Sequence, residues 1–249
     1  MIDFVNRYNE SGIACLPTKQ DKSPLLKDSW NNGFPPAMFK NAAGIGVICG
    51  KISGGLECMD FDNHFGDAEK ILTEYISIPE VNSIYKNHSL PIETSQRGGY
   101  HLLFRCNKNE GNRKLAQRAN SDGRPEAFIE TRGEGGYFMA YPSNGYKVIR
   151  NDIFKIATIT EYERAILIDN AVSMNEFFPK LIKTEYETTD RPGDLYNSNS
   201  DSISEMKSIL ISAGWQNIEG YKWRRPGKKD GISATLGKVA PNVFYVFTS

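Results

Sequence analysis

The sequence predicts an α+β fold, with an antiparallel or mixed sheet flanked by helices, followed by a small C-terminal α+β unit. Short apolar runs separated by glycine-rich or polar turns recur through the first half of the chain, which is typical of short strands. Segments with helical spacing lie between and after these runs. The composition agrees with a globular protein, because 39% of the 249 residues are hydrophobic and 24% are charged.

The first elements predicted are strands. Residues 12–17 form a short strand after a helical start, and a polar loop follows at 19–36. Residues 44–50 and 56–61 are two more strands. The glycine-rich turn between these two strands predicts a hairpin.

The remaining elements of the first domain follow the same logic of apolar runs and turns. In chain order they are a helix at 67–75, strands at 91–95 and 100–105, a polar basic loop at 107–125, strands at 127–131 and 136–141, and a helix at 160–178. Thr160 and Glu163 have the spacing of a capping box, in which two side chains satisfy two backbone donors at a helix start.

A polar run at 183–193 marks the expected boundary between a catalytic domain over 1–185 and an accessory unit over 190–249. The accessory unit is expected to contain a helix at 202–213 and a terminal strand at 243–248. Because the chain stops on an apolar strand, we expect the natural protein to continue beyond it.

The composition excludes several classes of protein. No run of eighteen apolar residues is present and the N-terminus lacks a signal-peptide pattern, so we expect a cytoplasmic protein with no membrane partner. The four cysteines lie scattered in apolar runs, which favours buried thiols over disulfides or zinc ligands. Thirty basic and thirty acidic residues balance, which argues against general coating of nucleic acid.

The charge is unevenly distributed along the chain. Residues 94–124 carry seven basic and two acidic side chains, and residues 215–240 carry six and two. Residues 159–190 carry three basic and seven acidic side chains. A net charge of zero is therefore compatible with a local, positively charged region of the surface.

Asp60 and Asp62 form the first candidate site. Residues two apart on a strand face the same side, so the two carboxylates would repel each other unless a cation neutralises them. Oxygen ligands favour Mg²⁺ or Mn²⁺. Glu57 has the opposite parity and should face the other side. The alternative is a pair of aspartates at a strand end entering a turn.

The second candidate site is the stretch from Ser95 to His101. Paired glycines at Gly98 and Gly99 allow a close backbone approach, and their N–H groups suit a phosphate. Arg97 and His101 add groups that bind phosphate oxygens. The alternative is a hairpin turn beside a partly buried histidine.

Glu130 and Arg132 form the third candidate site, just before another glycine-rich turn. Their spacing places them on one face of a strand. Glu130 is a candidate third metal ligand and Arg132 a candidate phosphate contact. The alternative is a simple ion pair between the two.

Taken in order, these stretches resemble the primase–polymerase (Prim-Pol) branch of the archaeo-eukaryotic primase superfamily. The resemblance covers roughly residues 5 to 180, and the joint match in order is far more specific than any single motif. The matching segments are Gly12 to Pro17, Lys22-Ser23-Pro24 and Trp30, Ile45 to Asp62, Gly98 to His101, and Glu130 to Ser143.

The resemblance implies an RRM-like palm fused to an N-terminal α/β unit. It implies that Asp60, Asp62 and Glu130 bind catalytic Mg²⁺ or Mn²⁺, although the family often has aspartate at the position of Glu130. The nucleotide-binding candidates are Ser95, Arg97, Gly98, Gly99, His101 and Arg132. The K-x-P lysine, Lys22, is a candidate DNA contact.

The tail resembles the segment that follows such domains in phage and plasmid primase–helicase proteins, on residues that include Arg191 to Asn197, Gly214-Trp215 and Trp223 to Lys228. This implies a helicase domain in the same or a neighbouring chain, in a prokaryotic host cell. Aromatic and basic side chains suit stacking and backbone contacts on single strands. The candidates are Trp223, Arg224, Arg225 and Lys228. The alternative is an exposed loop on a small core that contains the tryptophans.

The function that these stretches favour is template-dependent nucleotidyl transfer, a DNA primase and polymerase that uses a single-stranded DNA template and NTP or dNTP substrates. Two alternatives stay open. The same acids suit a metal-dependent nuclease, and the tail suits a non-catalytic module that binds single-stranded DNA.

Overall fold

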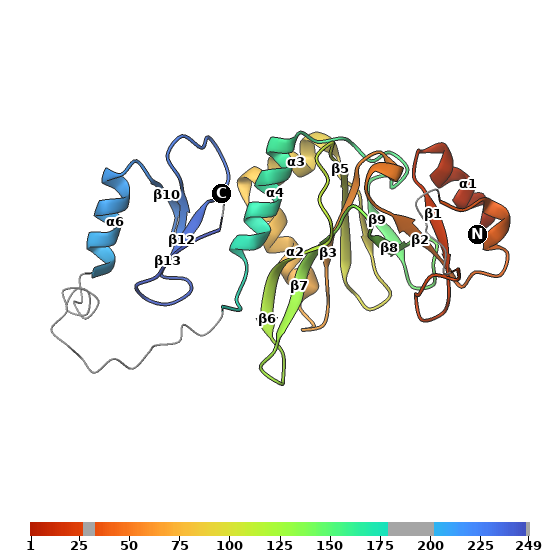
Figure 1. Ribbon diagram of the computed structural model, residues 1–249, viewed down its shortest axis with the longest axis horizontal. Coiled ribbons are helices and arrows are strands. Elements are labelled where there is room, and N and C mark those ends of the chain that lie inside the picture. Colours follow the sequence, from red (N-terminus) through yellow and green to blue (C-terminus); the bar gives the residue numbers. More distant parts are fainter. Residues whose placement is uncertain (27–32, 179–201, 248–249) are drawn as a thin grey trace.

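The structure is a computed structural model that describes residues 1–26, 33–178 and 202–247 (Figure 1). It confirms the α+β class, with antiparallel sheets and helices. The expected domain boundary at 183–193, Trp30 and the motif from Arg191 to Asn197 lie outside the described residues. None of the described helices has the length and apolar character needed to span a bilayer.

A three-stranded antiparallel sheet lies at the N-terminal end of the molecule (Figure 1). In spatial order its strands are β1 (Cys15–Thr18), β2 (Gly44–Ile48) and β8 (Tyr137–Ala140). Helix α1 (Ile2–Glu10) and the short 3₁₀ helix η1 (Pro36–Phe39) pack against it through Val5, Tyr8 and Phe39, which share its apolar cluster.

A six-stranded antiparallel sheet forms the centre of the molecule. In spatial order its strands are β6 (Arg113–Ala119), β7 (Pro125–Arg132), β3 (Leu56–Phe61), β5 (Tyr100–Arg105), β4 (Ile92–Thr94) and β9 (Lys147–Arg150). Strand β3 therefore lies inside the sheet, between β5 and β7.

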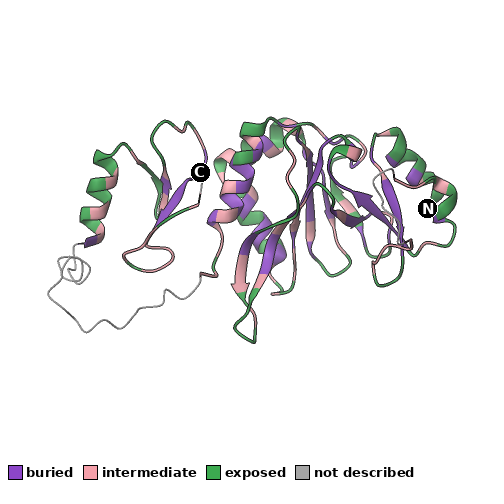
Figure 2. Ribbon diagram, viewed as in Figure 1, coloured by how far each residue is buried: buried purple, intermediate pink, exposed green. Residues whose placement is uncertain are grey.

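Helices α2 (Ala68–Ser77), α3 (Pro79–His88) and α4 (Glu161–Ser173) cover one face of this sheet, and Figure 2 shows the buried strands beside them. Met59 and Phe61 of β3 point toward these helices. Cys58, which has the opposite parity, belongs instead to the apolar cluster of the smaller sheet. The second face of β3 therefore faces the smaller sheet, and Asp60 lies on that face.

The predicted hairpin between 44–50 and 56–61 is wrong, because β2 and β3 belong to different sheets. Among the described residues, the two segments share only the isolated bridge between Gly50 and Leu56. A 3₁₀ turn, η2 (Lys51–Ser53), then Gly54 and Gly55 with φ of +65° and +77° redirect the chain from one sheet to the other.

The loop predicted at 107–125 contains strand β6. The sequence pattern hides this strand because its register against β7 shifts on both sides of Ala116. Helix α3 was not predicted either. It begins with proline at its first turn, where no backbone donor is lost, and buries Val81 and Ile84 three residues apart.

Helix α4 confirms the predicted capping box. The Thr160 hydroxyl accepts from the backbone N–H of Glu163, and the Glu163 carboxylate accepts from the backbone N–H of Thr160. Such a cap contributes about 1 kcal/mol to helix stability. The helix ends at Ser173, earlier than the predicted 178.

In residues 202–247 the C-terminal unit contains one helix and a four-stranded antiparallel sheet, close to the predicted helix and terminal strand. Its elements are α6 (Ser202–Ser212), β10 (Gln216–Glu219), β11 (Lys222–Arg224), β12 (Ala234–Leu236) and β13 (Phe244–Val246). Its small core is built around Trp223, Ala234 and Leu236.

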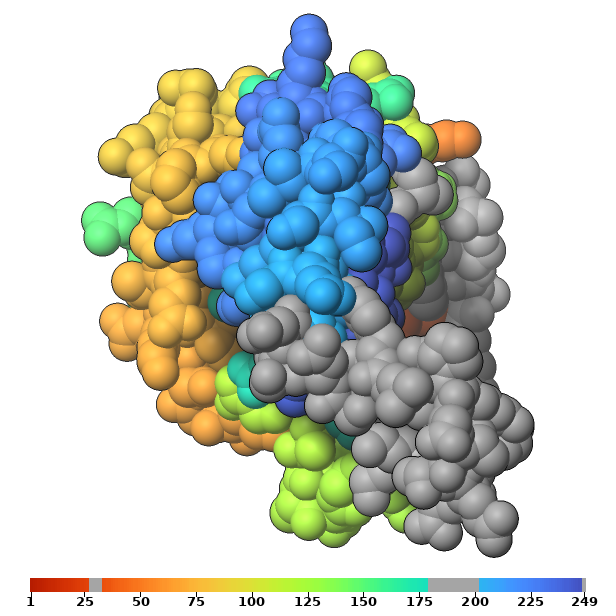
Figure 3. Space-filling view, turned by 90° about the vertical axis from the view of Figure 1, so that its left-hand side faces the viewer, coloured from red at the N-terminus to blue at the C-terminus, as the bar shows by residue number. Residues whose placement is uncertain are grey.

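This unit lies against the helices of the central domain. Figure 3 shows it in blue beside the orange and yellow surface of α2 and α3. Arg224 donates to Glu80 of α3 at 2.6 Å, and Lys228 donates to Asp169 of α4. The contact therefore contains ion pairs from both helices.

Candidate active site

Asp60 lies on an inner strand of the large sheet, and both neighbouring strands bring a polar side chain beside it. The pairing of β3 with β5 places His101 opposite Asp60, and the pairing with β7 places Glu130 opposite Asp60. Oxygen atoms of Asp60, Asp62 and Glu130 lie within 4.8 Å of one another. The sheet register therefore brings the three acids into one cluster.

The three carboxylates fit a divalent cation. Burial raises the pKa of Asp60, and the charge of Asp62 adds to this effect against the opposing influence of His101. Burial likewise raises the pKa of Glu130. Such a cluster is stabilised by a cation, and its oxygen donors are those that Mg²⁺ and Mn²⁺ prefer. Asp62 is one-third exposed, which leaves the cluster open to solvent.

Arg132 already neutralises part of this charge. Its guanidinium donates to the Glu130 carboxylate, and the same nitrogen lies 4.0 Å from Oδ2 of Asp60. The alternative ion pair between Arg132 and Glu130 is therefore present. About a third of the Arg132 side chain is exposed, so it is also accessible to a ligand above the acids.

A buried carboxylate forms a hydrogen bond with His101. Glu93 is fully buried on β4, where it accepts from His101 Nδ1 at 2.8 Å and from the Tyr141 backbone N–H at 3.0 Å. His101 Nε2 consequently points toward Asp60, 3.6 Å from its Oδ1. Burial opposes protonation of His101, but Asp60 and Glu93 outweigh it and raise its pKa.

The turn at Gly98 and Gly99 corrects one expectation. The Gly98 N–H donates to the Ser95 carbonyl and the Gly99 N–H donates to the Ser95 hydroxyl, so neither amide is directed at a ligand. A Cβ on Gly99 would lie 2.7 Å from the Phe61 carbonyl. These glycines allow the turn to pack against β3, and Arg97 at its tip is exposed.

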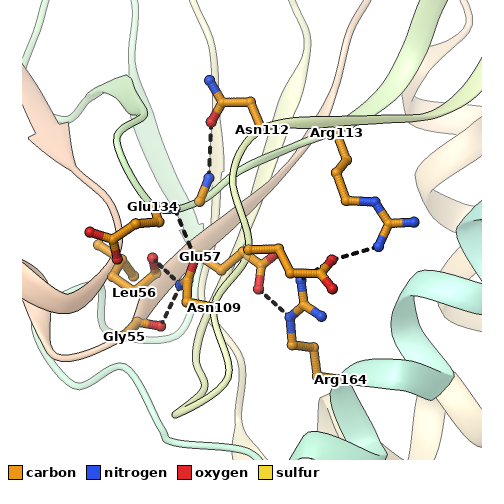
Figure 4. A network of polar contacts seen from close by, with 10 residues as sticks. Gly55, Leu56, Glu57, Asn109, Asn112, Arg113, Glu134 and Arg164 are labelled. Atoms are coloured by element: carbon orange, nitrogen blue, oxygen red, sulfur yellow. Dashed lines mark hydrogen bonds and ion pairs between the residues drawn. The ribbon is translucent and has the colours of Figure 1, made fainter.

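A second glycine-rich turn, at 133–136, is held by the segment before β6. Asn112 accepts from the Gly133 N–H at 3.1 Å and Asn109 accepts from the Glu134 N–H at 2.9 Å (Figure 4). A Cβ on Gly133 would lie 1.9 Å from the Glu110 carbonyl, which no side chain tolerates. This close approach fixes the backbone directly after Arg132.

Behind β3, Glu57 faces the helices, as its parity predicts. Arg164 of α4 donates to both of its carboxylate oxygens, at 2.6 and 2.9 Å, and both side chains are buried (Figure 4). Glu57 is therefore not a member of the acid cluster.

Asp60, Asp62 and Lys22 all line one cleft of about 350 Å³. The Lys22 ammonium lies 5.7 Å from the ring centroid of Tyr146, and the Lys22 carbonyl accepts from the Tyr137 hydroxyl at 3.0 Å. Lys22, predicted as a DNA contact, thus stands in the same cleft as Asp60 and His101.

The DNA-binding candidates in the tail are distributed differently from the expectation. Trp223 is fully buried in the core of the C-terminal unit, so it is not available for base stacking, and the alternative of a core tryptophan is correct. Arg224 and Lys228 form ion pairs with Glu80 and Asp169. Arg225 is exposed.

Several residues in the cleft or next to its acids and His101 were not found from the sequence. Glu93 carries one signal, since it is a lone acid in an apolar run immediately before the Ser95 stretch. Asn112 and Tyr146 line the cleft but have no motif. His64 is exposed, and yet its Nε2 lies 3.5 Å from Asp62 Oδ1.

Two comparisons with known proteins bear on this arrangement. A search of curated proteins gives no match. The family model described as "Bifunctional DNA primase/polymerase, N-terminal" matches residues 6–161. This segment covers more than half of the chain and contains all three acids, His101 and Arg132. The chain belongs to the bifunctional DNA primase/polymerase (Prim-Pol) family.

Proposed function

We propose that this protein makes and extends primers on a single-stranded DNA template by divalent-metal-dependent nucleotidyl transfer. The family supports primase and polymerase activity in general. The observation that carries the specific proposal is the single cleft that holds two of the clustered acids, His101, Arg132 and Lys22. Acids and cations that line one cleft match a metal-bound triphosphate, whose metal would contact the acids and whose phosphates would contact the cations.

Each side chain has a distinct role in this proposal. Asp60, Asp62 and Glu130 would hold Mg²⁺ or Mn²⁺, which activates a 3′-hydroxyl and neutralises charge that develops on the phosphates. His101 Nε2, oriented by Glu93, would donate to a phosphate oxygen. Lys22 and Arg132 would attract the triphosphate into the cleft.

The glycine amides are assigned no phosphate contact, because they donate within the Ser95 turn. Ser95 and Arg97 stay proposed nucleotide-binding residues at the edge of this turn. As the resemblance implies, the partners would be NTP or dNTP substrates and a helicase domain in the same or a neighbouring chain, in the cytoplasm of a prokaryotic host during phage or plasmid replication.

The test measures primer formation and primer extension on single-stranded DNA with labelled nucleotides and Mg²⁺ or Mn²⁺. The double variant Asp60→Asn/Asp62→Asn should lose at least 100-fold in rate, since removing one transition-state contact alone costs about that much. Asp122→Asn, an exposed acid in the turn between β6 and β7, is the matched control and should retain activity.

Undiminished synthesis by the double variant would overturn the proposal. Cleavage of labelled DNA in Mg²⁺ without nucleotides, lost in the same variant, would instead establish a nuclease. DNA binding with neither activity would establish a non-catalytic module.

A further inference from the structure

A hollow of about 800 Å³ lies apart from the acid cluster. It lies between α4 and the segment before β6 on one side and the turn between β11 and β12 on the other. The central domain contributes Lys108 and Arg113, and the C-terminal unit contributes Arg225, Lys228 and Lys229. Basic side chains therefore line it from both units.

The acids of this hollow are largely matched by cations. Arg113 donates to Glu110 at 2.7 Å, and Lys228 donates to Asp169. Arg113 and Arg225 also act electrostatically on Asp169, so three cations surround one carboxylate. The hollow thus keeps positive charge after its internal pairs are formed.

Three of its cations face solvent. Lys108, Arg225 and Lys229 are exposed, and no side-chain ion pair or hydrogen bond is found for them within the described residues. Glu161 is the one lining acid without an ion pair in that part of the chain. Two of these cations, Arg225 and Lys229, lie at the two ends of the turn Arg225-Pro226-Gly227-Lys228-Lys229.

Aromatic side chains complete the lining. Tyr162 of α4 is 45% exposed and its hydroxyl donates to Asp230, which fixes the ring at the border between the two units. Phe247 lies at the same hollow, from the C-terminal unit. An aromatic surface beside exposed cations is the combination that binds single-stranded nucleic acid by stacking and by phosphate contacts.

We propose that the cleft between the central domain and the C-terminal unit binds a single nucleic-acid strand through its phosphates, with Lys108 on one side and Arg225 and Lys229 on the other. The aromatic side chains beside the cations favour a single strand over a duplex, because the bases of a single strand are free to stack on them. This site is independent of the chemistry at Asp60 and goes beyond the nucleotidyl transfer proposed above.

The test uses the full chain and a labelled single-stranded oligonucleotide of about 15 nucleotides, close to the upper site size of small single-strand-binding folds. Binding is followed by fluorescence anisotropy across a salt series without divalent metal or nucleotide, so that failure of nucleotidyl transfer does not affect the result. Arg225→Ala/Lys229→Ala should weaken binding about tenfold. It should also make the salt slope shallower by about 1.4, since each phosphate contact on a single strand contributes about 0.7.

Lys40→Ala/Lys207→Ala removes two exposed lysines that do not line the cleft, and serves as the control of equal charge. Lys108→Ala tests the opposite wall and should weaken binding severalfold. Thermal unfolding of each variant should stay close to that of the parent, because none of these side chains forms an ion pair or a hydrogen bond within the described residues.

Four outcomes would overturn the proposal. Equal affinity and salt slope for Arg225→Ala/Lys229→Ala and the control would show that these cations do not contact the strand. No effect of Lys108→Ala would show that the strand does not lie in the cleft. If the substitutions weakened duplex binding as much as single-strand binding, the cations would not select a single strand. If a free dNTP competed as strongly as the oligonucleotide, the cations would bind a nucleotide and not a strand.

Discussion

Glu93 accepts a hydrogen bond from His101 Nδ1 at 2.8 Å while it accepts a second from the Tyr141 backbone N–H. A carboxylate can accept from both donors at once because it has two acceptor oxygens, whereas an amide has only one. Glu93 is fully buried, so it touches no substrate and acts by orienting the imidazole. It is a positioning residue for His101.

Replacing Glu93 by Gln should therefore raise the KM for nucleotide by several-fold to tenfold while kcat changes less. A glutamine keeps the volume of the side chain but presents an NH₂ group to one of the two donors. The double variant Glu93→Gln/His101→Ala should be no worse than His101→Ala, because the effect passes through the histidine. Steady-state kinetics on a primed template measures both. Additive losses in the double variant would show that Glu93 does not act through His101.

Gly133→Ala should destabilise the protein and lower its activity, because its Cβ would lie 1.9 Å from the Glu110 carbonyl, directly after Arg132. Gly111→Ala is a matched control in the same region, since its Cβ would lie 3.8 Å from the Glu134 carbonyl, an ordinary contact. Thermal unfolding and primer extension should separate the two. Equal behaviour of the two variants would contradict the close-approach argument.

Breaking the buried pair between Glu57 and Arg164 from one side should cost about 3–5 kcal/mol, because the partner charge would stay buried without compensation. Arg164→Met is the single variant. The double variant Glu57→Leu/Arg164→Met should recover much of the loss, since it removes both charges. Urea unfolding of the three proteins measures this. A double variant as unstable as the single one would contradict the charge explanation.

Stability should also depend on pH above neutrality, through Lys238. Burial lowers the pKa of Lys238 to about 8, and its ammonium donates to the Ser173 carbonyl. The unfolded chain has the ordinary lysine pKa of about 10.4, so between about pH 8 and 10 it binds more protons than the folded chain. Stability contributed by Lys238 therefore rises with pH in this window.

Lys238→Met lacks this titration. The melting temperature of the parent should rise relative to that of Lys238→Met as the pH increases from 8 to 10. A constant difference in melting temperature between the two proteins over that range would show that burial does not lower the pKa of Lys238.

The sequence predicted the strands of the site well and their arrangement poorly. The alternation around Asp60 and Asp62 and the capping box at Thr160 are local signals, and both have the expected form. The assignment of β2 and β3 to different sheets depends on packing between distant segments, which a turn pattern does not encode. Glu93 and Asn112 were missed for the same reason, since each acts on a partner in another strand or turn.

The placement of the acids on β3 and β7 has a consequence for how the protein folds. Asp60 and Glu130 are neighbours only through strand pairing, although seventy positions of chain separate them. Contacts between such distant segments form slowly, because a long loop must close first. The complete cluster of three acids therefore does not exist in a nascent or partly folded chain until β7 has joined β3. Capture of a divalent ion by all three carboxylates would then report that the central sheet has closed.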